Sequence, residues 1–238
     1  MSSTEQSKPL SSDDYSKVLY DKTVHCPICG QQSTNKAVKS SAIRVSSRDT
    51  DSMIYYSGIN PSFYEVVYCT FCGYAALPAY FEKVKPFHVS KILEQVTKVW
   101  VKPSYPDHFD AEFAIKQLKL ALHISLLKDA KDSEKGLLCL KLSWLYRLIE
   151  DQDNERRFQE QTLLCFENAY MNEKFPVAGM DEFSFQYLIG ELYRRTGNSD
   201  KALLYYSKVL TSNNAPARIK DKVRDQKDIL TKELNQND

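Results

Sequence analysis

The chain has 238 residues, of which 42% are hydrophobic and 12% are aromatic, so it can bury a core and disorder over most of its length is not expected. Lysine and arginine total 32 against 31 acidic residues, and this balance excludes a general attraction of the molecule to nucleic acid or to membranes. The length suits one large domain or two modest ones.

The N-terminal segment is rich in serine, aspartate, glutamine and lysine. We expect residues 1–20 to form a flexible polar tail, because they hold too few apolar groups to offset the entropy lost on ordering. The segment lacks the apolar core of a secretion signal, and no later stretch is long and apolar enough to cross a bilayer. Six cysteines in such a chain indicate a reducing compartment, so the expected location is the cytoplasm.

Residues 21–78 contain short runs of β-branched and aromatic residues, separated by turn residues such as Gly58. This pattern predicts a small β domain. A helix is expected at about 89–99, and Pro103 and Pro106 follow it. Because proline interrupts helical hydrogen bonding, residues 79–108 are interpreted as a helical linker.

Two copies of a Cys-x-x-Cys-Gly motif lie in the β domain. The motifs supply four candidate metal ligands, which are Cys26, Cys29, Cys69 and Cys72. A two-residue gap lets both sulfurs of a pair point at one ion, and the following glycine permits the tight turn. Four thiolates complete a closed tetrahedral site, so the predicted role is structural and the predicted metal is Zn²⁺.

Other interpretations of these cysteines stay open. Iron is the main rival, because rubredoxin-like sites use the same knuckle and sulfur ligands do not distinguish the two metals by spacing. A redox pair fits less well, since the motif is duplicated and carries a glycine after each pair. His25 could replace one cysteine as a ligand, although neighbouring residues on a strand point to opposite faces.

The segment between the two cysteine pairs concentrates polar and aromatic residues. Its candidate binding surface consists of Arg48, Asp49, Asp51, Tyr55, Tyr56 and Asn60. The alternative is a structural loop in which the aspartates form turns and Arg48 pairs with one of them. A basic stretch nearby could, together with Tyr55 and Tyr56, contact single-stranded nucleic acid by charge and stacking. It contains Lys36, Lys39, Arg44 and Arg48.

Residues 109–238 have apolar residues at helical spacing, which predicts about six helices joined by short turns. Five residues are expected to cap or precede these helices, namely Asp110, Ser133, Asp153, Asp181 and Asn198. Residues 187–209 match a tetratricopeptide unit, with Gly190, Tyr193, Gly197, Ala202 and Tyr206 at the motif's spacing. Residues 142–169 form a partial earlier copy.

No catalytic constellation accompanies these features. Cys139 and Cys165 lie among apolar residues of predicted helices and are interpreted as core residues. His88, His108 and His123 are scattered without the spacing of metal ligands. A non-enzymatic role is therefore favoured. An enzyme centred on Asp49 and Asp51 is the last-ranked alternative, and it would require a pocket with perturbed carboxylates and an additional nucleophile or metal.

Several of these motifs together resemble one bacterial family. The residues that carry the resemblance are Cys26-Pro-Ile-Cys29, Arg48-Asp-Thr-Asp51, Gly58-Ile-Asn-Pro61 and Cys69-Thr-Phe-Cys-Gly-Tyr-Ala-Ala76. The family has no assigned function and joins a four-cysteine zinc ribbon to tetratricopeptide-like helices. The resemblance implies metal binding at the four cysteines in a cytoplasmic bacterial protein, and it supplies no activity.

Together these observations predict an α+β fold that is mostly α, with a small N-terminal zinc-ribbon domain at 21–78 and a tetratricopeptide-like helical domain at 109–238. The expected function is that of a non-enzymatic, metal-stabilised adaptor whose helices bind a protein or peptide partner. The alternative is a zinc-ribbon protein associated with nucleic acid. No membrane partner is expected.

Overall fold

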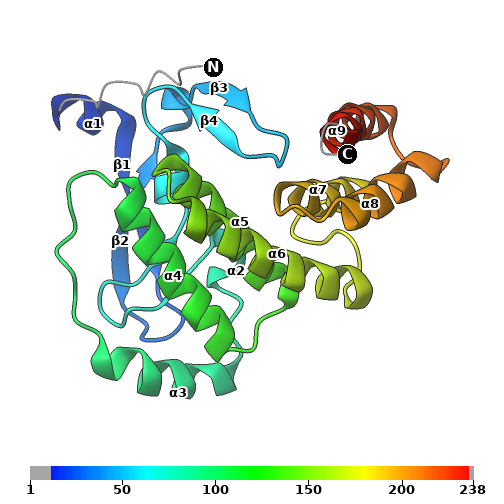
Figure 1. The fold of residues 1–238 in the computed structure, drawn as a ribbon. Helices are drawn as coiled ribbons and strands as arrows, with labels where there is room; N and C mark the ends of the chain where they lie inside the picture. The colour runs from blue at the N-terminus through cyan, green and yellow to red at the C-terminus, as the bar shows by residue number, and fades with distance from the viewer. Residues whose placement is uncertain (1–11, 236–238) are drawn as a thin grey trace. The chain divides into compact units, whose positions relative to one another are not determined.

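The computed structural model describes residues 12–235. Small strand hairpins are followed by a long helical region, which confirms the α+β, mostly α fold class (Figure 1). The chain divides into two compact units. In the described residues, unit 1 comprises 12–49, 53–130 and 148–150, and unit 2 comprises 50–52, 131–147 and 151–235.

Unit 1 contains three antiparallel hairpins. In the first, β1 (Leu19–His25) pairs with β2 (Gln32–Val38) in a register that sets Leu19 opposite Val38 and His25 opposite Gln32. In the second, β3 (Val45–Arg48) pairs with β4 (Ile54–Tyr56), and in the third β5 (Val67–Tyr68) pairs with β6 (Ala75–Ala76). Each pair forms its own two-stranded sheet.

Part of the segment predicted to be a flexible tail, residues 1–20, has regular structure. Helix α1 (Ser12–Val18) precedes β1, whose first residue, Leu19, is buried. The amide of Lys39 donates a hydrogen bond to the carbonyl of Val18 at 2.8 Å. The chain is therefore folded from residue 12 onward, while residues 1–11 lie outside the described part of the chain.

Helices and short 3-10 turns complete unit 1. They are α2 (Pro78–Phe81), α3 (Pro86–Gln95) and α4 (Ala111–Leu127), with η1 (Ser40–Ala42), η2 (Pro61–Tyr64) and η3 (Thr97–Val99). The predicted linker thus contains α3 and η3. Helix α4, which the sequence boundaries assign to the helical domain, packs against β6 and η2 instead. The rings of Tyr64 and Phe109 stack just before α4, with centroids 4.9 Å apart, so the start of this helix packs against η2.

Unit 2 is a set of helices. These are α5 (Asp132–Leu148), which belongs to unit 2 as far as Arg147, then α6 (Gln152–Asn172), α7 (Glu182–Arg195), α8 (Ser199–Thr211) and α9 (Ala217–Asn235). With α4, the described chain has six helices after residue 109, as predicted. Asp181 and Asn198 cap α7 and α8 as expected, whereas Asp151 and not Asp153 caps α6.

The core of unit 2 is built on α7, whose apolar residues recur at helical spacing. Phe185, Leu188, Ile189 and Leu192 are almost completely buried. Helices α7 and α8 lie side by side (Figure 1). A methyl group on Gly190 would lie 2.7 Å from the ring of Tyr206, so the absence of a side chain permits this close approach.

Within residues 12–235, no helix combines the length and the apolar character that crossing a bilayer requires.

Candidate metal centre

Both cysteine pairs lie on hairpin turns of unit 1. The first pair follows β1 and precedes β2, and the second lies between β5 and β6. Gly30 and Gly73 have φ angles of 71° and 77°, a left-handed conformation that glycine adopts without steric cost. Their amides donate to the carbonyls of Cys26 and Cys69 at 3.0 Å, so each turn closes tightly around its two sulfurs.

The fold brings the four sulfurs together although the two pairs are 40 residues or more apart in sequence. All four Sγ atoms lie within 4.8 Å of one another. The Sγ atoms of Cys26 and Cys72 are 3.5 Å apart, and those of Cys29 and Cys69 are 3.6 Å apart. Four sulfurs at about 2.3 Å from a tetrahedral zinc ion are separated by about 3.8 Å. The four cysteines therefore fit a tetrahedral metal ion.

The crowded thiols perturb one another. Hydrogen bonding with Cys69 is the largest effect on Cys26 and raises the pKa of its thiol to about 12. Hydrogen bonding with Cys26 raises the pKa of Cys72, while the bonds that Cys69 accepts from Cys26 and Cys72 lower the pKa of Cys69. A bound cation favours the thiolate form of clustered cysteines.

A polar bridge joins the two cysteine hairpins and was not found by sequence reasoning. The side-chain amide of Asn35 donates to the carbonyl of Tyr68 at 2.9 Å and accepts the Tyr68 amide at 2.9 Å. The Ser33 hydroxyl accepts the Thr70 amide at 3.0 Å. Ser33 and Asn35 are buried. Their side chains on β2 therefore satisfy backbone groups of β5 and of the turn after it.

Two residues after α3 support the second cysteine turn. The Trp100 indole N–H donates to the carbonyl of Thr70 at 3.1 Å, and the hydroxyl of Thr97 donates to the carbonyl of Cys72 at 3.0 Å. A side chain at Gly73 would meet the Trp100 ring at 2.5 Å. The absence of a side chain at Gly73 therefore permits the left-handed turn and leaves room for the Trp100 ring.

Three of the cysteines, Cys26, Cys69 and Cys72, are buried to 1% exposure or less, and Cys29 is partly exposed. When four thiolates fill a tetrahedral site, no position remains for water or substrate. The four cysteines could therefore hold a metal ion, and a donor set of this kind is typical of structural sites.

One protein-family model covers most of the chain. The model of a family described as an uncharacterized protein conserved in bacteria (DUF2225) matches residues 19–230. The chain belongs to the DUF2225 family. The matched segment includes all four cysteines and most of the helical unit, and the family description supplies no activity. No curated protein and no solved structure matches the chain.

Most of the candidate binding surface of this DUF2225 chain lies in unit 1. Arg48 is exposed on β3, and Tyr55 and Tyr56 are half-buried on β4. The hydroxyl of Tyr55 donates to the carboxylate of Asp49 at 3.5 Å. Asn60 caps η2 by accepting the amide of Ser62 at 3.0 Å, which is a structural role.

Asp51 is different, because it belongs to unit 2 and its side chain is 0% exposed. Arg147 donates to its two carboxylate oxygens at 2.6 and 3.2 Å, and the indole of Trp144 donates to it at 3.1 Å. Asp51 therefore presents no free surface. The structural-loop alternative predicted that Arg48 pairs with one of the two aspartates. The arginine that pairs with Asp51 is Arg147, which the sequence did not indicate.

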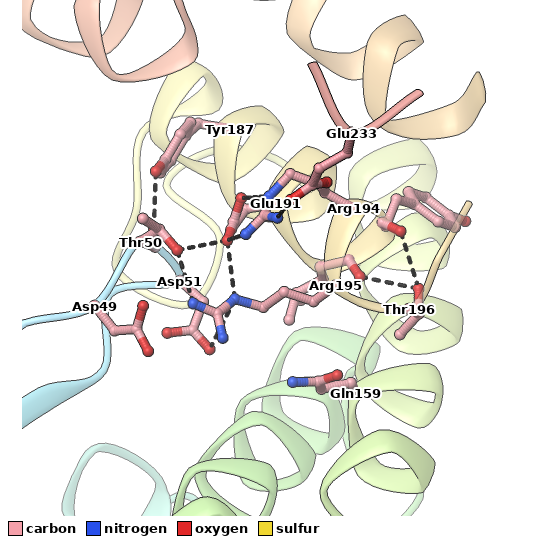
Figure 2. A network of polar contacts seen from close by, with 12 residues as sticks. Asp49, Thr50, Asp51, Gln159, Tyr187, Glu191, Arg194, Arg195, Thr196 and Glu233 are labelled. Carbon is pink, nitrogen blue, oxygen red and sulfur yellow. Dashed lines mark hydrogen bonds and ion pairs between the residues drawn. The ribbon is translucent and has the colours of Figure 1, made fainter. Parts of the chain in front are cut away.

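A second buried carboxylate lies in the same network (Figure 2). Glu191 accepts hydrogen bonds from Arg194, Arg195, Tyr206 and the hydroxyl of Thr50. Burial by itself would raise the pKa of Glu191, but the hydrogen bonds from Arg194 and Thr50 and the nearby guanidinium groups lower it. This carboxylate is thus held in its charged form.

The buried network of unit 2 pairs carboxylates with guanidinium groups. Arg147 also donates to Glu155 at 2.7 Å, and Gln159 donates to the same carboxylate at 2.9 Å. Burial opposes the charge of Arg147, yet hydrogen bonding with Asp51 raises its pKa. Three carboxylates and three guanidinium groups are therefore paired with one another, an arrangement that suits the positioning of side chains.

Of the two remaining cysteines, Cys139 is buried in the core as expected, whereas Cys165 is only partly buried. Burial raises the pKa of the Cys139 thiol to about 12, and burial also raises the pKa of Cys165. A high thiol pKa leaves little thiolate at neutral pH. Neither cysteine is therefore set up as a nucleophile.

Proposed function

We propose that this chain is a metal-stabilised adaptor, in which a zinc ribbon forms part of unit 1 and tetratricopeptide-like helices in unit 2 bind a protein or peptide partner. The observation that supports the proposal is the close packing of α7 against α8 at Gly190 and Tyr206. Repeat helices stack into an extended concave surface, and such surfaces commonly hold peptides.

The residues at the motif positions support this interpretation. Gly190 allows α7 to approach Tyr206 on α8, and Gly197 adopts a φ of 84° between the two helices. Ala202 and Tyr206 are completely buried. Just before the partial earlier copy, a methyl group on Gly136 would lie 2.5 Å from Phe166, so α5 and α6 also pack a glycine against an aromatic ring.

Zinc is the proposed metal. The sulfur–sulfur distances suit either zinc or iron, but zinc needs no redox partner and commonly fills structural four-cysteine sites. Thiolate ligands persist in a reducing environment, so the cytoplasm is the proposed location. Absorption spectroscopy separates the metals, because an iron–thiolate site is coloured and a zinc site is not.

The contacts of the basic stretch favour the adaptor over the nucleic-acid alternative. Lys36 forms an ion pair with Asp21 at 2.7 Å. Lys39 donates to the carbonyl of Lys17, and Arg44 donates to carbonyls of its own loop. Three cations of the basic stretch therefore contact neighbouring groups of their own unit, and Arg48 is exposed on β3.

The test is affinity capture from bacterial lysate with the full chain and two variants. Gly190→Val forces a side chain into Tyr206 and should abolish capture while the metal stays bound. Ser207→Val, on the exposed face of α8, is the matched control and should capture normally. Capture that survives Gly190→Val, or a wild-type chain that captures nothing, would contradict the proposal.

A further inference from the structure

A short segment of the chain, Thr50-Asp51-Ser52, is held inside unit 2 in the way a bound peptide is held (Figure 2). It is a three-residue loop, closed where the amide of Asp49 donates to the carbonyl of Met53 at 2.8 Å. The side chains that hold it come from α5 and α7. These are the first helices of the two helix pairs in the proposed repeat arrangement.

The recognition covers both side chains and backbone. The Asp51 carboxylate lies between Arg147 and the indole of Trp144, with the Nε of Arg195 at 4.0 Å. The Thr50 hydroxyl donates to Glu191 and accepts from Arg195 at 2.7 Å. The Thr50 carbonyl accepts the hydroxyl of Tyr187 at 2.9 Å. Two successive residues are therefore identified by their hydroxyl, their carboxylate and their main chain.

The groups that contact the segment are oriented independently of it. Glu155 fixes the Nε of Arg147 at 2.7 Å. Arg194 and Tyr206 hold Glu191 at 2.9 and 3.0 Å. A site whose donors are already fixed loses little entropy when it binds a ligand. Bidentate pairing with Arg147 further selects a carboxylate over a neutral amide.

We infer that the helical unit is a binding site for an acidic peptide in which a hydroxyl residue precedes an aspartate, and that the chain's own Thr50-Asp51 occupies this site in cis. The inference rests on the proposed adaptor function and names the chemistry of its partner. A tethered segment has an effective concentration of roughly millimolar, so a partner peptide binds strongly only when the segment is displaced.

The experiment uses the full metal-loaded chain and a fluorescein-labelled peptide of residues 48–53. In the variant Thr50→Gly with Asp51→Gly, the site loses its internal ligand but keeps the loop length. Fluorescence anisotropy should show saturable binding to this variant, at least tenfold tighter than to the wild-type chain. The same peptide with Asp51→Asn should bind at least tenfold more weakly.

Two further substitutions in that variant locate the site. Arg147→Met should abolish peptide binding, whereas Arg156→Met, which removes an exposed guanidinium on α6, should leave it unchanged. If the double-glycine variant is poorly folded, the measurement becomes its thermal unfolding. The peptide should then raise the unfolding midpoint, because it binds only the folded unit.

A folded double-glycine variant that does not bind the peptide overturns the inference, as does a poorly folded one whose midpoint the peptide leaves unchanged. Binding that ignores Arg147→Met or the Asp51→Asn peptide also overturns it. These outcomes are separate from the lysate capture that tests the adaptor function, because they need only purified chain and synthetic peptide.

Discussion

The ion pair between Asp51 and Arg147 offers the most quantitative test of unit 2. Asp51→Asn keeps the shape of the side chain and removes its charge. The carboxylate is 0% exposed and the Arg147 side chain is 14% exposed, so solvent screens the pair very little. Breaking a buried pair by neutralising one partner typically costs about 3–5 kcal/mol. Because Glu155 still pairs with Arg147 at 2.7 Å, we expect a loss near the lower end, about 3 kcal/mol.

The assay is urea unfolding of the metal-loaded chain, followed by far-UV circular dichroism with extrapolation to zero denaturant. Glu160→Gln is the matched control, because Glu160 pairs with Arg156 at the surface, where the two side chains are 53% and 67% exposed. Such an exposed pair contributes less than about 1 kcal/mol. A loss for Asp51→Asn that is no larger than the control's would refute the assigned role of the buried network.

Three further predictions concern other parts of the molecule. Gly190→Val should lower the unfolding free energy by about 1–3 kcal/mol through overpacking against Tyr206, whereas Ser207→Val should not; equal melting curves would contradict this. Asn35→Ala leaves the buried amide and carbonyl of Tyr68 unpaired, so a chromophoric chelator should remove the metal faster than from wild type, and unchanged release would argue against the bridge. Because the pKa of Glu191 is lowered from 4.5 on folding, its charged form stabilises the fold above pH 4.5, and this stabilisation is lost as the pH falls through the folded-state pKa. Glu191→Gln should therefore reduce the fall in unfolding free energy at acid pH, and an unchanged fall would contradict the assignment.

The cysteine cluster was predictable because its information is local. Each Cys-x-x-Cys-Gly motif specifies its own turn, and duplication of the motif indicates that the two turns share an ion. The sequence does not show how the turns are held together. Asn35 and Ser33 carry no recognisable signature, because their partners lie more than thirty residues away on β5 and its turn.

The helical half was predictable for a related reason, since apolar spacing and capping residues act within one or two turns. Asp110, Asp181 and Asn198 cap helices as expected. Asp153 was misplaced by two residues because Asp151 is an equally good cap. Helix α4 has ordinary helical periodicity, and periodicity does not reveal that its buried face packs against β6 instead of another helix.

The network around Asp51 could not be derived from the sequence. Arg147 lies 96 residues further along the chain, and nothing about a lone arginine on a helix indicates a buried aspartate as its partner. The polar Arg-Asp-Thr-Asp segment did stand out as unusual for a connector. Its residues take different roles, since Arg48 is exposed on a strand and Asp51 is buried among the helices of unit 2.

The central claim is that the four cysteines hold one structural metal ion. Metal content by mass spectrometry on untagged protein tests it most directly, with Cys69→Ser and Cys72→Ser variants measured alongside. We predict about one zinc ion per chain in the wild type, and loss of that zinc in both variants. A wild-type chain without metal, or variants that retain the full metal content, would contradict the account.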